Sequence, residues 1–147
     1  AGRTFPGVWS PRHWVRSSPD GSRIAFLMRD DAGGVQLWIV SPNGGTPTRV
    51  TRNPSNIASA FSWSPDGRHI AHVIGNSVCV TDAITGQTVH LTVALPIETG
   101  PRPEACVFSP NGRHIAYVRP VCTPGGVFNQ VFVVDAPAAV AKDSPDT

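Results

Sequence analysis

Three serines hold the same place in a recurring tetrapeptide, and they are the first residues to consider as nucleophiles. The copies are Ser18-Pro19-Asp20-Gly21, Ser64-Pro65-Asp66-Gly67 and Ser109-Pro110-Asn111-Gly112. A catalytic serine is often presented on an elbow such as Gly-x-Ser-x-Gly, and the sequence contains no such elbow. Proline, aspartate, asparagine and glycine are instead turn residues, and serine hydroxyls bond the backbone of turns. We therefore predict that these serines cap turns.

For four of the five histidines, the equivalent residues in the other copies of the repeat indicate a structural position. His69 and His114 stand where the first copy has Arg23, so we expect an exposed position on a strand. His72 takes a place that is aromatic in the other two copies, which predicts packing in the core. His90 corresponds to an arginine of the expected outer strand.

His13 stands apart, because it comes where the first strand of a repeat begins. Polar side chains near this point and at its counterparts in the other copies are expected to gather on one surface and bind a ligand or partner. These candidate binding residues are Arg12, His13, Arg16, Asn56, Ser59, Arg102 and Glu104. The alternative is that Arg12-His13-Trp14 only anchors the chain at the entrance to the strand.

The cysteines and glycines do not indicate a cofactor or a metal. Cys79, Cys106 and Cys122 lack a Cys-x-x-Cys spacing, and the first two fall in apolar runs where a buried thiol is expected. Neither Gly-x-x-x-x-Gly-Lys nor Gly-x-Gly-x-x-Gly occurs. Unpaired thiols favour a reducing, cytoplasmic location, whereas a periplasmic location would require a signal peptide upstream of residue 1.

Charge and hydropathy exclude two further classes. The formal net charge is +2, and no arginine-rich run with interleaved aromatic residues appears, so a nucleic-acid surface is not expected. No apolar stretch approaches the roughly 18 residues that a membrane-spanning helix needs, so no membrane span is predicted.

The tetrapeptides also reveal the elements that must position these residues. They start 46 and 45 residues apart, so the chain contains three copies of one unit. Each turn is followed by the same pair, Ile24-Ala25, Ile70-Ala71 or Ile115-Ala116, and then by a ring and an aliphatic residue. Further short apolar runs follow at residues 37–40, 78–81 and 131–134. Short β-branched runs bounded by Gly, Pro, Asn and Asp predict strands and turns, and no helical period is present.

Each unit is predicted to be four antiparallel strands in about 45 residues, which is the blade of an all-β propeller. The predicted divisions are a lead segment at 1–13, blades at 14–51, 52–92 and 93–135, and a mobile tail at 136–147. The third blade is expected to lack its outer strand, because nothing after Asp135 matches the endings Arg49-Val50-Thr51 and His90-Leu91-Thr92. Arg3-Thr4 resembles the end of such a strand from a preceding blade; alternatively, the N-terminal stretch supplies the missing strand of the last blade.

Two connections are longer in the third copy, at residues 92–109 and 120–126. Insertions of this kind commonly lie on the working face of repeat proteins, which is why Arg102 and Glu104 are among the candidates.

The turn followed by Ile-Ala and an aromatic residue resembles the WD40-like repeats of TolB-type propellers, over residues 10–135. A nearer resemblance, to a bacterial family of TolB-like propellers, rests on Pro11-Arg12-His13-Trp14-Val15-Arg16, on residues 24–31 and on Val35-Gln36-Leu37-Trp38. In that family such segments open the last three blades, which implies that this chain is half of a six-bladed ring. The first strands of the blades then line the central channel, and the candidate residues lie on its rim.

Three blades form an arc, whereas propellers close with four to eight blades. We expect the arc to be completed by the remaining half of a longer chain, or by a second copy in a six-bladed dimer. The leading functional hypothesis is a non-catalytic binding or scaffold module for a protein, peptide or glycan. The alternative is part of a propeller enzyme, either a metal-dependent sugar-acid lyase or a propeller attached to a hydrolase, whose other half carries further ligands.

Overall fold

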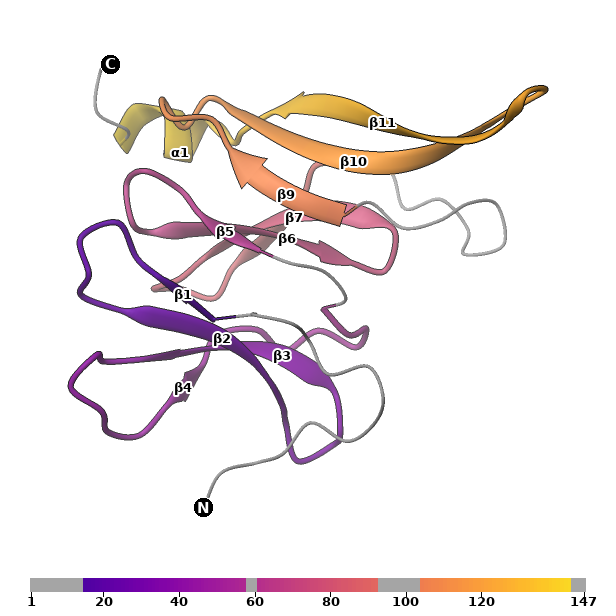
Figure 1. The fold of residues 1–147 in the computed structure, drawn as a ribbon. Coiled ribbons are helices and arrows are strands. Elements are labelled where there is room, and N and C mark those ends of the chain that lie inside the picture. The colour runs from indigo at the N-terminus through magenta and orange to yellow at the C-terminus, as the bar shows by residue number, and fades with distance from the viewer. Residues whose placement is uncertain (1–14, 58–60, 93–103, 144–147) are drawn as a thin grey trace.

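The computed structural model describes residues 15–57, 61–92 and 104–143, except for the side chains of residues 104, 105 and 141–143. These residues form three antiparallel β-sheets, which follow one another along the chain and stack face to face (Figure 1). The fold is all-β, as the short apolar runs and turn residues predict.

Each strand of a sheet pairs with the next strand along the chain. The first sheet contains β1 (Val15–Ser17), β2 (Ile24–Arg29), β3 (Val35–Val40) and β4 (Thr48–Arg49). The second contains β5 (Ser62–Trp63), β6 (His69–Ile74), β7 (Ser77–Asp82) and β8 (Thr88–His90). The third, within the described residues, contains β9 (Glu104–Phe108), β10 (His114–Thr123) and β11 (Gly126–Asp135). Four-stranded antiparallel sheets of this kind are propeller blades.

The two central strands pair in the same register in all three sheets. The first isoleucine after each turn is opposite Val40, Thr81 or Val134, and the aliphatic residue three places later is opposite Leu37, Val78 or Val131. Leu37, Val78 and Val131 are therefore equivalent positions, and residues around them can be compared directly between blades.

The tetrapeptide serines cap turns, as the sequence predicts. Ser18 Oγ donates to Asp20 Oδ1 at 2.7 Å and accepts from the Arg23 backbone N–H at 3.0 Å, and Ser64 and Ser109 bond the same positions of their own turns. The glycines that end the tetrapeptides have φ of 72°, 70° and 68°. This left-handed conformation favours glycine, because other residues have a Cβ that clashes there.

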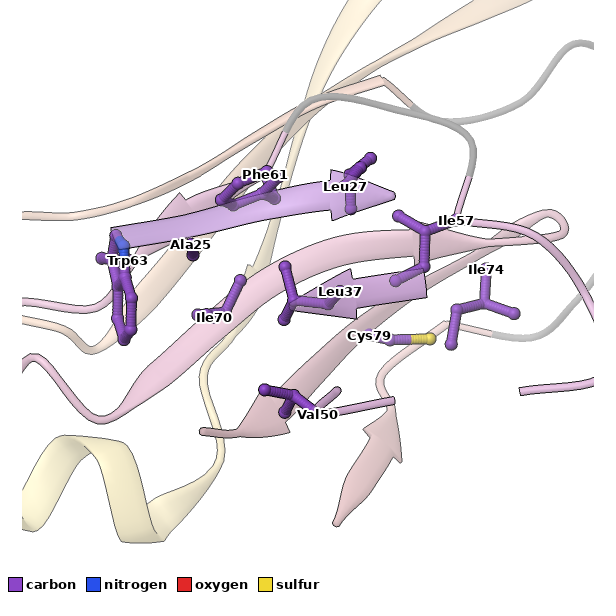
Figure 2. Packing of buried hydrophobic residues seen from close by; sticks show 10 residues of the cluster. All are labelled: Ala25, Leu27, Leu37, Val50, Ile57, Phe61, Trp63, Ile70, Ile74 and Cys79. Atoms are coloured by element: carbon purple, nitrogen blue, oxygen red, sulfur yellow. The ribbon is translucent and has the colours of Figure 1, made fainter. Parts of the chain in front are cut away.

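The first of two cores fills the space between the first and second sheets (Figure 2). Ala25 and Leu37 of the first sheet and Ile70 and Cys79 of the second are completely buried. Burial of an aliphatic side chain of this size contributes roughly 1.5–3 kcal/mol. The other residues in Figure 2 are Leu27, Val50, Ile57, Phe61, Trp63 and Ile74.

The second core lies between the second and third sheets. Val73 and Val78 point away from the first core and pack with Ile115 of the third sheet. The second sheet is thus buried on both faces, and every residue of β6 is buried. Side chains alternate between the two faces of a strand, so the single apolar run of β6 serves both cores.

A segment of the third blade and the segment that follows this blade differ from the sequence prediction. The expected loop at 120–126 is wrong, because β10 continues to Thr123 and β11 begins at Gly126, which makes a long hairpin that extends beyond the other strands (Figure 1). Pro120 is tolerated since β9 pairs with β10 only as far as Val118. In the segment expected to be a mobile tail, residues 138–143 form helix α1 (Ala138–Asp143), whose Val140 is completely buried. No helix in the described part of the chain is long and apolar enough to cross a membrane.

Candidate functional site

The structure describes three of the seven predicted site residues. Arg16 lies in β1, Asn56 lies in the segment that crosses from the first sheet to the second, and Glu104 opens β9 with an undescribed side chain. The remaining four are outside the described residues: Arg12, His13, Ser59 and Arg102. Convergence of the seven residues on one rim therefore stays a prediction.

The two described side chains belong to segments that contact other strands. The Arg16 carbonyl accepts a hydrogen bond from Trp63 Nε1 at 3.0 Å, which joins β1 to β5. The Asn56 Oδ1 accepts from the Val35 backbone N–H at 2.7 Å at the start of β3. Asn56 stays exposed while its oxygen is held, so its side chain is fixed in position at the surface.

A buried polar network holds the crossover segment to the first blade. Gln36 and Thr51 are each 1% exposed. Thr51 Oγ1 donates to Gln36 Oε1 at 2.7 Å and accepts from the Leu37 backbone N–H at 2.9 Å. Gln36 Nε2 donates to the Asn53 carbonyl at 2.8 Å, and Gln36 Oε1 accepts from the Asn53 N–H at 3.2 Å. A buried polar group without its partner costs about 1–3 kcal/mol, so the network opposes movement of residues 51–53.

Arg52 is the residue that sequence reasoning missed here. It lies between Thr51 and Asn53, which are both hydrogen-bonded to Gln36, and its side chain is exposed. The β2–β3 turn lies beside the same segment, because a Cβ at Gly34 would be 3.6 Å from Asn56 Oδ1. We call the turn at residues 30–34 and the crossover at residues 52–56 the crossover rim. The available signal was the sequence position of Arg52, next to the Arg-Val-Thr ending and four residues before Asn56.

A pocket of about 230 Å³ opens between β4 and the β7–β8 turn. Arg49, at the pocket, forms an ion pair with Asp30 at 3.1 Å, and within the described residues Arg52 has no carboxylate partner. Counting only the described residues, the pocket has one positive charge without a carboxylate partner and room for a small anionic group. Its lining residues are Thr48, Arg49, Val50, Arg52, Ala83, Ile84, Thr85 and Gly86.

The second blade brings together a serine, a carboxylate and an imidazole, but not in the order of a catalytic triad. His69 Nδ1 lies 2.8 Å from Asp66 Oδ2, and Ser64 Oγ donates to the other oxygen of Asp66. In a triad the imidazole accepts the proton of the serine, whereas here the carboxylate does. The same serine-to-carboxylate or serine-to-amide bond occurs in the other two turns at 2.7 Å, so the arrangement is turn capping.

The expected exposure of the shared histidine position is wrong for His69, which is 6% exposed. The second blade has neighbours on both faces, and Asp82 Oδ2 lies 4.0 Å from His69 Nε2 on the adjacent strand. Arg68 closes the cluster by donating to Asp82 Oδ2 at 2.8 and 3.0 Å. His114, on the third blade, remains exposed as predicted.

Hydrogen bonds keep the turn carboxylates ionised. Burial alone would raise the pKa of Asp66, but bonds from Ser64, the Arg68 amide and His69 outweigh it and lower the pKa. Burial also opposes ionisation of Asp82, and the Arg68 guanidinium with two backbone amides nevertheless lowers its pKa to about 2. Ionised carboxylates that accept several hydrogen bonds stabilise the turns and do not act as general acids.

A second row of polar side chains crosses β6, β7 and β8. His72 is opposite Cys79, and Cys79 is opposite His90, whose Nδ1 lies 3.3 Å from the Cys79 sulfur. His72 is completely buried, as predicted, and burial together with His90 lowers its pKa to about 3. Its Nε2 bonds Thr81 Oγ1 at 2.6 Å.

The thiols of the cores are poor nucleophiles. Cys79 and Cys106 are buried as predicted, and burial raises the pKa of Cys79 and raises that of Cys106 to about 12. Among residues 15–57, 61–92 and 104–143, no three His, Cys, Asp or Glu side chains are grouped as metal ligands.

Comparison with known proteins identifies similar chains. The uncharacterized protein YidR of Escherichia coli K12 is 44% identical over 117 residues, which are 79% of this chain and 28% of that protein. The structure of a putative TolB from Agrobacterium tumefaciens matches with a TM-score of 0.63 and 26% identity, over 81% of this chain and 40% of that one. This chain is built of TolB-like propeller blades.

Other propeller proteins share the fold without sharing much sequence. An oligogalacturonate lyase in complex with manganese matches with a TM-score of 0.61 and 15% identity, over 86% of this chain and 35% of that one. Such a low identity supports the fold alone. No family model matches the chain, so membership of the narrower repeat family stays a prediction. The chain spans less than half the length of each of these proteins.

Proposed function

We propose that this chain is part of a TolB-like propeller that acts as a non-catalytic binding or scaffold module, through the channel rim. The observation that carries the proposal is the Gln36–Thr51–Asn53 network, which holds a surface segment rigid from beneath while Arg52 and Asn56 stay exposed. Preorganised surface groups bind without the entropic penalty of ordering a loop. A buried polar network under an exposed crossover therefore favours recognition.

The arginines predicted for the channel rim favour an acidic ligand. The predicted site residues include three arginines, Arg12, Arg16 and Arg102, and a single carboxylate, Glu104. Arg52 adds a fourth guanidinium to this set. Arginine binds carboxylates in a bidentate manner, so acidic peptides and uronic-acid glycans are the ligands that this composition suits.

The competing proposal is a propeller enzyme that uses metal-binding histidines. It draws support from the manganese-bound oligogalacturonate lyase, which has the same fold, and from the position of His13 near the predicted channel. The serine and histidine of the second blade support the binding module instead, since their polar atoms are taken up by the turn at Ser64–His69.

The test uses purified chain with two acidic probes, oligogalacturonate and a poly-glutamate peptide, each measured by calorimetry with and without Mn²⁺. A binding module gives saturable binding of at least one probe without metal, weakened about tenfold or more by Arg52→Ala with Arg102→Ala. Arg113→Ala, at the opposite end of the blades, serves as the control and should bind normally. Stoichiometric Mn²⁺ that is lost in His13→Ala, with cleavage of oligogalacturonate, would favour the enzyme. Absence of binding to both probes would contradict the acidic-ligand proposal.

A further inference from the structure

The pocket lined by residues 48–50, 52 and 83–86, which we call the outer pocket, lies away from the expected channel. Its strand β4 is at one edge of the first sheet, and β1, which carries Arg16, is at the opposite edge. Pockets for drug-sized ligands have volumes of about 300–1,000 Å³. The outer pocket, with about 230 Å³, therefore suits a smaller molecule, of the size of a monosaccharide.

Hydrogen bonds fix the wall of the outer pocket that comes from the second sheet. The backbone N–H groups of Ile84 and Thr85 donate to Asp82 Oδ1 at 2.8 and 3.1 Å, and the Gly86 N–H donates to the Asp82 carbonyl at 2.8 Å. Arg68 holds the other carboxylate oxygen of Asp82 at 2.8 Å. The β7–β8 turn thus has a single, well-braced conformation.

The wall from the first sheet is held as well, and the two walls touch. The Val50 N–H donates to the Leu37 carbonyl at 2.8 Å, and Thr51, the next residue, donates to the buried Gln36. A Cβ at Gly86 would lie 2.7 Å from the Val50 carbonyl oxygen, so the turn is in close contact with the strand. A pocket with fixed walls binds without the entropic cost of ordering a loop.

The corresponding place between the second and third sheets holds helix α1 instead of a turn. The Ala83 N–H donates to the Arg68 carbonyl and the Ala136 N–H to the Arg113 carbonyl, both at 2.8 Å, so Ala83 and Ala136 are equivalent. Ala83 begins the β7–β8 turn, whereas Ala136 leads into α1, whose Val140 is buried in the second core. The repeat itself therefore does not require a hollow at this place.

The charges at the outer pocket favour a ligand with one negative charge. Arg49 Nη1 is paired with Asp30 Oδ2 at 3.1 Å, while Arg52 has no carboxylate partner among the described residues. A carboxylate carries one negative charge and accepts two parallel hydrogen bonds from a guanidinium. A phosphate monoester carries a charge of about −1.5 to −2 at pH 7, which leaves excess negative charge near Asp30.

The remaining lining groups suit the body of a small polar molecule. Thr85 Oγ1 accepts from the Gln87 N–H at 3.2 Å, which leaves the hydroxyl proton of Thr85 for a ligand oxygen. Thr48 supplies a second hydroxyl from the opposite wall. The apolar part of the lining comes from Val50, Ala83 and Ile84.

We propose that the outer pocket binds a small organic monocarboxylate, with its carboxylate on Arg52 and a polar group on Thr85. By neutralising Arg49, Asp30 sets the preference for a single negative charge. Arg52 also belongs to the crossover rim, but the pocket is completed by β4 and the β7–β8 turn. The inference is therefore independent of the function proposed for the channel rim.

The first experiment is an NMR titration of the chain with three probes of similar size: galacturonate, galactose 1-phosphate and neutral galactose. Galacturonate shifts the backbone amides of residues 84–86 and of Arg52 saturably, with a dissociation constant on the order of 1 mM. Galactose binds at least about tenfold more weakly, because it cannot pair with the guanidinium. Galactose 1-phosphate also binds more weakly than galacturonate, because of its second negative charge.

Two variants test the contacts, and a third serves as the control. Arg52→Gln removes the unpaired charge and weakens galacturonate binding about tenfold or more. Thr85→Val removes one hydroxyl from an exposed turn and weakens binding about fivefold. Arg113→Gln, at the opposite end of the blades, binds galacturonate as the unaltered chain does.

Asp30→Asn tests the charge preference directly. The asparagine keeps the Oδ1 atom, which accepts from the Gly34 N–H at 2.9 Å, but it no longer neutralises Arg49. With two positive charges at the pocket, the preference reverses, and galactose 1-phosphate binds more tightly than galacturonate. If this variant does not fold, the three probes on the unaltered chain and Thr85→Val still decide the question.

Four results would overturn the proposal. They are equal affinity for galacturonate and galactose, unchanged affinity in Arg52→Gln, an unchanged preference in folded Asp30→Asn, and shifts that leave residues 84–86 unmoved. Shifts confined to Arg52 would place the ligand on the crossover rim instead of in the pocket. Any of these results leaves the channel-rim proposal standing, because that proposal is tested with the longer acidic probes and with Arg102→Ala.

Discussion

Replacement of His72 by phenylalanine is expected to remove much of the acid sensitivity of this fold between about pH 7.5 and pH 5. His72 is completely buried in β6, and burial together with His90 lowers its pKa to about 3. In the unfolded chain the pKa of a histidine is about 6.5. Between these values the unfolded state binds more protons than the folded state, so the free energy of unfolding rises with pH.

The magnitude follows from the two pKa values. At about pH 5 an unfolded histidine is almost fully protonated, while His72 in the folded chain is almost fully neutral. Protonation of the unfolded state then lowers the free energy of unfolding by about 2 kcal/mol relative to pH 7.5. The folded pKa scarcely affects this figure as long as it lies below about 4. Carboxylates contribute little in this range, because their unfolded pKa values are near 4.

Phenylalanine is the suitable replacement because the first blade has Phe26 at the equivalent position. The hydroxyl of Thr81 still has Thr88 as a partner, at 2.7 Å. Urea unfolding is followed by tryptophan fluorescence at several pH values, for the unaltered chain, His72→Phe and His114→Gln. The control removes an exposed imidazole, so its curve should stay parallel to that of the unaltered chain within about 0.5 kcal/mol.

The expected outcome is that the stability difference between His72→Phe and the unaltered chain shifts by about 2 kcal/mol in favour of the variant as pH falls to 5. Parallel curves for these two proteins would refute the reasoning. They would mean that His72 becomes protonated in the folded state, which requires water or a counter-charge to reach it.

Three further predictions concern packing, hydrogen bonding and thiol chemistry. Gly86→Ala should destabilise the chain by about 2 kcal/mol or more in urea unfolding, because the new Cβ would lie 2.7 Å from the Val50 carbonyl oxygen and the residue has a φ of +75°. The control is Gly44→Ala, which also has a positive φ but open space around it, and it should cost only about 1 kcal/mol. Equal losses would contradict the close approach of the β7–β8 turn to β4. Thr51→Val should lower the free energy of unfolding by about 1–3 kcal/mol, since it removes a buried hydroxyl that makes two hydrogen bonds, and the Leu37 amide should then undergo faster hydrogen exchange. Thr48→Val, at an exposed site, should leave the free energy of unfolding nearly unchanged. With a thiol reagent at about pH 8, the exposed Cys122 should react quickly, and Cys79 and Cys106 only after unfolding, because burial raises the pKa of both. Rapid reaction of all three would show that the cores open readily.

Several features of the fold could be predicted from short segments of sequence. The turns at Ser18, Ser64 and Ser109 depend on neighbouring residues, and their geometry follows from proline, glycine and a serine hydroxyl. The burial of His72 could be predicted too, because aligned copies show what kind of side chain a position accepts. The long β10–β11 hairpin was missed, since Pro120 and the glycines near its tip indicate a loop unless the pairing of Val121 with Phe128 is known.

The candidate site was less predictable, because its residues come from separate segments. The sequence indicates Asn56 because it is near the start of the first strand of the second copy. Its bond to Val35 and the network beneath it depend on how the crossover lies against β3. The charge of the pocket beside Arg52 likewise depends on the fold, because Asp30 pairs with Arg49, the other arginine of the pocket. His69 was misjudged because exposure depends on how many neighbours its blade has.

The sequence alone determines that this protein is a repeat of β-blades, since turn and strand preferences are local and the copies are in register. Only the tertiary structure decides which face of each strand is buried, because that depends on the next blade rather than on the strand itself. The same strand position is thus completely buried at Leu37 and Val78 and mostly exposed at Val131. Leu37 and Val78 face the next blade across a core, whereas among the described residues no blade packs on the Val131 face of the third sheet.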